Sequence, residues 1–156
     1  MGVVAARLAE LGLTLPAVAA PVATYVPAVQ SGKYVYTSGQ LPFVDGALAE
    51  AGKVGDGDGL VAPAAAAGYA RTATLNALAA IGDLIGDLDK ISRIVKVTGY
   101  VASDPTFTGQ PKVVNGASDL LGEIFGPAGI HARSAVGVAV LPLNSPVEIE
   151  LLVELH

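Results

Sequence analysis

The chain has 156 residues, a length typical of one domain, and 52% of them are hydrophobic while only 15% are charged. Its net charge of −5 and its scattered basic residues argue against a nucleic-acid-binding surface, and no uninterrupted run of about 18 apolar residues could span a membrane. The lack of cysteine excludes disulfides, thiolate nucleophiles and thiol metal ligands, and a cytoplasmic location is expected.

The first 40 residues predict one short helix and a pair of strands. Helical spacing covers Gly2–Leu11, and Leu13–Leu15 is compatible with a brief strand. Tyr25–Val29 and Lys33–Thr37 are typical of two paired strands, with Gln30–Gly32 as the tight turn between them.

The connection that follows, Leu41–Leu60, is rich in glycine and aspartate and predicts a flexible loop. Its segment Gly55–Gly59 resembles a calcium-binding loop only superficially. An EF-hand requires glutamate at the twelfth position, and counting from Asp56 that position is Ala67.

The second half predicts two helices on either side of a strand. Pro63–Leu84 has helical spacing and begins with a proline, which suits a first helical turn. Ile91–Ala102 has a largely alternating pattern that predicts an internal strand, and Pro111–Phe125 carries the apolar stripe of a second helix.

The C-terminal region contains the clearest strand pattern. Val147–Leu155 places apolar residues on one face and mainly glutamates, including Glu148, on the other. Arg133–Leu141 predicts the preceding strand, and the turn residues of Pro142–Pro146 separate the two. A guanidinium at the start of that strand, on Arg133, is well suited to binding a carboxylate through two parallel hydrogen bonds.

The order of these elements, two strands, helix, strand, helix and two strands, predicts an α+β domain of two layers. The excess of apolar over charged residues also suits a subunit that buries surface against other copies.

Two segments resemble the RidA/YjgF family of reactive intermediate deaminases, some of which are labelled endoribonuclease L-PSP. ARSAVGVAVLPLNSPVEIE, residues 132–150, is similar to the family's C-terminal signature, and YVPAVQSGKYVYTSGQLP, residues 25–42, is similar to its N-terminal hairpin. The resemblance implies that residues 1–156 form one RidA-like domain with a chorismate-mutase-like fold, in which two helices cover one face of the sheet. It also implies a homotrimer with ligand sites between subunits.

The resemblance implies roles for individual residues. Arg133 would hold a substrate carboxylate, and Glu148 would act on the attacking water. The residues that it places at the substrate are Tyr25, Ser38, Gly39, Asn115, Ser134 and Ala135.

Each role has a structural alternative: a surface ion pair for Arg133, a hairpin aromatic packed on the core for Tyr25, an ordinary helix polar residue for Asn115, and a solvated strand position for Glu148. The chain also departs from the family pattern. Ala135 stands where RidA proper has a cysteine, and the loop from Phe43 to Leu60 is longer, so substrate preference does not carry over.

The strands raise a question of geometry. If Pro142–Pro146 closed a simple hairpin, Arg133 would lie opposite about Leu155 and Glu148 opposite about Val140, roughly 23 Å apart along the ribbon. One small ligand could not bridge that distance, so a site with both residues would require a curled sheet or two subunits.

The resemblance thus implies hydrolysis of small 2-imino or enamino acids to 2-keto acids and ammonia, as by a 2-iminobutanoate/2-iminopropanoate deaminase, without a cofactor. No metal site is expected from two histidines, His131 and His156, and scattered carboxylates. The alternative is a trimeric protein that binds small carboxylate metabolites without turnover. RNA cleavage rests only on the family label, and the acidic charge argues against it.

Overall fold

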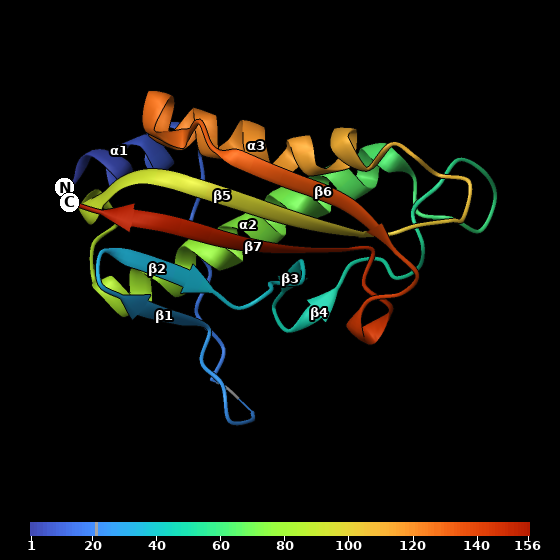
Figure 1. Cartoon of the computed structure of the whole chain (residues 1–156), viewed down its shortest axis with the longest axis horizontal. Helices are drawn as coiled ribbons and strands as arrows, with labels where there is room; N and C mark the ends of the chain where they lie inside the picture. The colour runs from blue at the N-terminus through green and yellow to red at the C-terminus, as the bar shows by residue number, and fades with distance from the viewer. Residues whose placement is uncertain (21) are drawn as a thin grey trace.

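The computed structural model describes residues 1–20 and 22–156 of the chain. Three α-helices, seven strands and three short 3₁₀ turns follow one another in the described part (Figure 1). In chain order they are α1 (Val3–Glu10), β1 (Ala28–Ser31), β2 (Tyr34–Thr37), β3 (Phe43–Val44), β4 (Ala47–Leu48), α2 (Pro63–Ile85), η1 (Leu88–Lys90), β5 (Ile91–Ala102), α3 (Gln110–Phe125), η2 (Gly126–Gly129), β6 (Ala132–Val138), η3 (Pro142–Asn144) and β7 (Val147–Leu155).

Five strands form a mixed sheet in the order β1-β2-β7-β5-β6, in which only the β5–β6 pair is parallel. Strands β6 and β7 therefore do not form a hairpin, because β5 lies between them. The segment that joins them passes around the end of β5, where Ala102 N donates to Pro146 O at 2.9 Å and Ser103 N donates to Val138 O at 2.9 Å. The hairpin geometry considered from the sequence is wrong for this reason.

Helices α2 and α3 cover one face of this sheet, as expected for a two-layer α+β fold (Figure 1). The alternating strands supply the buried face, and Val97, Val101, Ile149 and Val153 are all fully buried. Burial of each such side chain contributes about 1.5–3 kcal/mol, so the alternation fixes which face of each strand turns toward the helices.

The N-terminal helix α1 packs against α3 and η1 at one end of the molecule. The Asp89 carboxylate accepts hydrogen bonds from Val3 N and Val4 N, both at 2.7 Å, and so satisfies donors that the first turn of a helix leaves unpaired. His156 N donates to Lys90 O at 3.1 Å, so both ends of the chain lie beside η1 (Figure 1).

Among the described residues no helix covers the other face of the sheet, which combines aromatic with acidic side chains. Tyr34, Tyr36 and Val136 are 40%, 46% and 42% exposed there. Glu148 and Glu150 alternate with the buried residues of β7 and therefore lie on this same open face.

The predicted helices and the strands Ile91–Ala102 and Val147–Leu155 are confirmed, each within two residues at every end. Three local predictions are wrong. Leu13–Leu15 forms no strand, and its leucines pack against the core instead. The first strand begins at Ala28, after Pro27, which has no N–H to donate, and the turn lies at residues 32–33.

The fourth difference is the connection after β2, which is not wholly a loop. Asp45 and Gly46 have φ of 51° and 79° and join β3 to β4 in a two-residue hairpin.

Candidate functional site

The residues predicted for the site fall into two groups on the chain. The first group lines a cavity of about 490 Å³ that we call the Glu148 pocket. It contains Tyr25, Ser38, Gly39 and Glu148, and apolar side chains such as Leu143 complete its wall.

The backbone of residues 38–40 brings this group together. Ser38 N donates to Pro27 O at 2.8 Å and Ser38 Oγ donates to Val26 O at 2.7 Å, which fastens the segment that carries Tyr25. Gly39 packs directly against the Glu148 side chain, and a Cβ at position 39 would overlap the Glu148 carboxylate. Glycine is therefore needed at position 39 for the backbone to approach Glu148 this closely.

Glu148 has a perturbed acidity. Its pKa is raised above the ordinary value of a glutamate, first because partial burial disfavours the charged form and second because the negative charge of Glu150 lies nearby. A carboxylate with a raised pKa in a pocket is a candidate general base, because its basicity is closer to that needed for accepting a proton at neutral pH.

The second group surrounds Arg133 at the edge strand β6. Arg133 Nη1 donates to Asn115 Oδ1 at 2.8 Å and to Ser118 Oγ at 3.1 Å, while Nη2 donates to Pro111 O at 3.4 Å. These three contacts with α3 use three of the five N–H groups of the guanidinium. Within the described residues, Nε–H and one N–H of Nη2 remain for another acceptor, and such neighbouring donors suit the two oxygens of a carboxylate.

The structure does not bring Arg133 and Glu148 together within one chain. Arg133 is in register with Val97 on the helix-covered face, whereas Glu148 is in register with Tyr100 on the open face. Two strand spacings and three residues of rise separate them, roughly 14 Å between backbone positions. A site that contains both residues thus requires a second copy of the chain. The reason is their position on opposite faces of the sheet, and not the separation along a hairpin that was considered from the sequence.

The remaining predicted residues lie near Arg133 with different orientations. Asn115 holds the guanidinium directly. Ser134 is in register with Thr98 and turns toward the open face, away from the Arg133 side chain. Ala135 is partly buried and packs against the core, so its side chain contributes shape rather than polar contact.

Sequence reasoning missed three polar residues beside these groups. Ser118 follows Asn115 by three residues on the same face of α3, and that spacing was a usable signal. His131 bonds to Ser118, a contact that depends on the turn between α3 and β6. Asn76 Nδ2 donates to Leu41 O at 2.9 Å and Phe43 O at 3.1 Å, and it thereby holds one wall of the Glu148 pocket.

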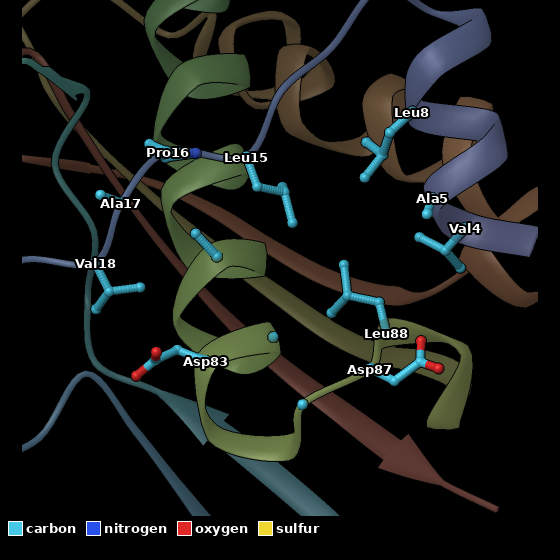
Figure 2. A pocket seen from close by; sticks show the side chains of 13 residues that line it. Val4, Ala5, Leu8, Leu15, Pro16, Ala17, Val18, Asp83, Asp87 and Leu88 are labelled. Carbon is cyan, nitrogen blue, oxygen red and sulfur yellow. The ribbon is translucent and has the colours of Figure 1, made fainter. Parts of the chain in front are cut away.

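A second cavity, of about 400 Å³, lies between α1, the following segment and the C-terminal end of α2. Figure 2 shows Leu8, Leu15 and Leu88 pointing into it, with Asp83 and Asp87 at its margins. Asp87 already accepts a hydrogen bond from Asp89 N at 2.9 Å. The cavity contains none of the predicted site residues, and its lining is mainly aliphatic.

Within residues 1–20 and 22–156, no cluster of three histidine or acidic side chains has the arrangement of a metal site. In the same part of the chain, none of the helices is both long and apolar enough to cross a bilayer.

Comparisons with known proteins show similarity along almost the whole chain. A family model described as "YjgF/chorismate_mutase-like, putative endoribonuclease" matches residues 5–155. Protein TCP17 of Trypanosoma cruzi is 45% identical over 156 residues, which cover 99% of this chain and 96% of that protein.

Solved structures agree with this match. A protein of unknown function from Agrobacterium tumefaciens is 46% identical with a TM-score of 0.89, over 99% of this chain and 93% of that one. Escherichia coli TdcF, whose structure contains bound serine, is 25% identical with a TM-score of 0.62, over 92% of this chain and 96% of that one.

Proposed function

This chain belongs to the YjgF/chorismate mutase-like family, and on that basis we propose that it hydrolyses small 2-imino or enamino acids to 2-keto acids and ammonia. The observation that carries the proposal is the Arg133 guanidinium, which α3 holds by three hydrogen bonds, while two of its N–H groups have no acceptor among the described residues. Its neighbouring free donors match a carboxylate, the group that every 2-imino acid shares. TdcF, a relative, binds serine, which carries the same group.

The working assembly in this proposal is a homotrimer that buries the open face of the sheet. Exposed Tyr34, Tyr36 and Val136 give that face apolar area to bury, and the low charge of the chain reduces repulsion between copies. Packing of identical copies around a rotation axis can set the β6 edge of one against the Glu148 pocket of the next. Arg133 and Glu148 then meet in one site, although they lie on opposite faces of a single sheet.

In this site Arg133 binds the substrate carboxylate and fixes the imine carbon beside Glu148. Glu148 accepts a proton from water as the oxygen attacks that carbon, and solvent supplies a proton to the imine nitrogen, which gives a carbinolamine. As the carbinolamine collapses, its hydroxyl proton passes to solvent and the C=O bond forms, while the C–N bond breaks and the nitrogen leaves as ammonia with the proton from Glu148. The raised pKa of Glu148 suits it to accept the water proton and return it to the departing nitrogen.

A second candidate function is binding of a small carboxylate metabolite without turnover. The bound serine in TdcF supports it, because serine is a stable amino acid and not an imine. RNA cleavage, which the family description also names, is less well supported because Glu148, Glu150 and Glu154 make the open face acidic.

The proposal is tested by generating 2-aminoacrylate or 2-iminobutanoate in situ and following the disappearance of the imine. Wild-type protein should accelerate it, and Arg133→Ala should not, because the bidentate carboxylate partner is lost. Wild-type binding of 2-oxobutyrate without acceleration of any short imino acid would favour the second function. An undiminished rate in Arg133→Ala would contradict the mechanism.

A mixing experiment tests the shared site. Arg133→Ala and Glu148→Gln subunits are each expected to be inactive in pure form. Co-expression in equal amounts should restore about one quarter of the sites, because each site draws one residue from each of two copies. If both residues acted within one copy, mixing would restore nothing.

A further inference from the structure

A chain of hydrogen bonds runs from the backbone at Gly129 through two side chains to the Arg133 guanidinium. His131 Nδ1 lies 2.7 Å from Gly129 O, His131 Nε2 lies 2.9 Å from Ser118 Oγ, and Arg133 Nη1 donates to the same Oγ at 3.1 Å. We infer that His131 and Ser118 are positioning residues that hold the Arg133 guanidinium with Nε–H and one Nη2–H free for the substrate carboxylate. The inference deepens the proposed function and rests on it for the role of Arg133.

The contacts fix the direction of each proton. A carbonyl oxygen can only accept, so the proton of the Gly129–His131 contact must be on Nδ1. In the neutral ring, Nε2 then carries a lone pair and accepts the single hydroxyl proton of Ser118. The lone pairs of Ser118 Oγ remain for Arg133, which has only donors.

Without His131, the Ser118 hydroxyl would have the alternative that helix hydroxyls ordinarily use. In α2, Thr74 Oγ1 donates to Ala70 O at 2.8 Å and Thr72 Oγ1 to Gly68 O at 3.3 Å, each one turn back in the helix. His131 Nε2 instead draws the Ser118 proton toward itself, which fixes the orientation of the oxygen that Arg133 meets. The histidine thus acts on Arg133 through Ser118.

The local fold explains why the histidine ring is held in place. Gly129 is buried against α3, and a Cβ there would overlap the Leu121 carbonyl, so glycine permits η2 to lie directly on the helix backbone. This contact places the Gly129 carbonyl beside the His131 ring two residues later. His131 directly precedes β6, and Arg133 is the second residue of that strand.

The first experiment measures the tautomer and needs no substrate. Ring ¹⁵N shifts of His131 in the intact protein at neutral pH should show a protonated Nδ1 and an unprotonated Nε2. A proton on Nε2 would overturn the inference, because Ser118 could then not donate to it. In the same samples, the ¹⁵N relaxation of Arg133 Nε–H should report a rigid side chain in the wild type and a more mobile one in Ser118→Ala.

The second experiment separates positioning from a general structural effect. Ser118→Ala should raise KM for the imino acid about tenfold with kcat within about twofold, since carboxylate binding serves ground and transition states alike. His131→Phe should act in the same direction, through loss of the acceptor for the Ser118 proton. Ser118→Thr should keep the wild-type KM because it keeps the hydroxyl. His131→Gln should have a KM between those of the wild type and His131→Phe, because its amide oxygen can accept the Ser118 proton.

The matched control is Thr72→Ala, which removes a helix hydroxyl whose hydrogen bond, in the described part of the chain, is to Gly68 O within α2. It should leave KM and Arg133 mobility unchanged. A wild-type KM and a rigid Arg133 in Ser118→Ala would overturn the positioning role. If the wild type turned over no imine, the proposed function would fail, while the tautomer and the arginine relaxation would still decide this inference.

Discussion

Gly99→Ala tests how the fold positions Arg133 and its hydrogen-bond acceptors on α3. Gly99 lies on β5 under α3, and a Cβ there would stand 2.5 Å from Val114 Cγ2 and 2.7 Å from Val114 Cγ1. Carbon atoms in good contact are about 3.5–4.0 Å apart, so the added methyl is roughly 1 Å too close. Val114 is fully buried and cannot turn into solvent, so α3 must move away from the sheet.

Overpacking of this kind costs about 1–3 kcal/mol of folding free energy. Val114→Ala alone removes two buried methyl groups and should cost about 2 kcal/mol, including the cavity that it leaves. In the double variant the new methyl enters the space that Val114 vacates. The loss should therefore be smaller than the sum of the two single losses by about 1 kcal/mol or more.

The assay is urea unfolding at one fixed protein concentration, because subunit association would shift the apparent stability. Gly68→Ala is the control, since a Cβ at this helical glycine meets no atom within 4 Å, and its stability should hold or rise by up to about 1 kcal/mol. Strictly additive losses in the double variant would refute the reasoning. So would a Gly99→Ala variant as stable as the Gly68→Ala control.

The same series reports on the site. Asn115 follows Val114 on α3, so displacement of the helix should loosen the acceptors of Arg133. Calorimetry with 2-oxobutyrate should show weaker binding in Gly99→Ala and recovery in the double variant. Equal binding in all variants would mean that the helix position does not control Arg133.

Three further outcomes are expected. Arg133→Lys should lose most imine turnover, because one ammonium cannot donate the parallel pair of a guanidinium; a wild-type rate would contradict this. Glu148→Gln should keep 2-oxobutyrate binding but lose turnover, since an amide cannot accept the water proton. Because the pKa of Glu148 is raised, wild-type turnover should already fall on acidification at a pH higher than the ordinary pKa of a glutamate. Light scattering should give about three times the 15.6 kDa chain mass, and a mass near that of one chain would exclude the trimer.

Elements with a clear local pattern of apolar and polar residues are the ones that the sequence predicts well. Val147–Leu155 was predicted with its observed bounds because strict alternation directly reflects one buried and one open face. The strand order was not predictable in the same way. The pairing of β5 between β6 and β7 joins residues far apart in the chain, and no local signal near Pro142–Pro146 distinguishes this arrangement from a hairpin.

The site was predicted as a set of residues but not as an arrangement. Family resemblance named Arg133, Glu148 and Gly39, and the structure explains Gly39 by its close contact with Glu148. The bond between Ser118 and His131 had no sequence signature, because thirteen residues and a 3₁₀ turn separate the two side chains. The hydroxyl and the imidazole become neighbours only when η2 folds back onto α3.

Glu148 shows that stability and the proposed chemistry make opposite demands on one strand. Alternation in β7 places Ile149 in the core and Glu148 on the open face, where burial and Glu150 raise the Glu148 pKa. A glutamate whose pKa is raised on folding binds its proton more tightly in the folded state. The favourable contribution of Glu148 to the free energy of unfolding is therefore fully present below the pKa that Glu148 has in the unfolded chain. It is lost as the pH rises through the higher pKa that Glu148 has in the folded chain. At neutral pH the charged carboxylate thus opposes folding, and Glu148→Gln should raise stability while it removes turnover. That opposition is expected of a residue whose place is set by chemistry, whereas an ordinary solvated strand position would show neither effect.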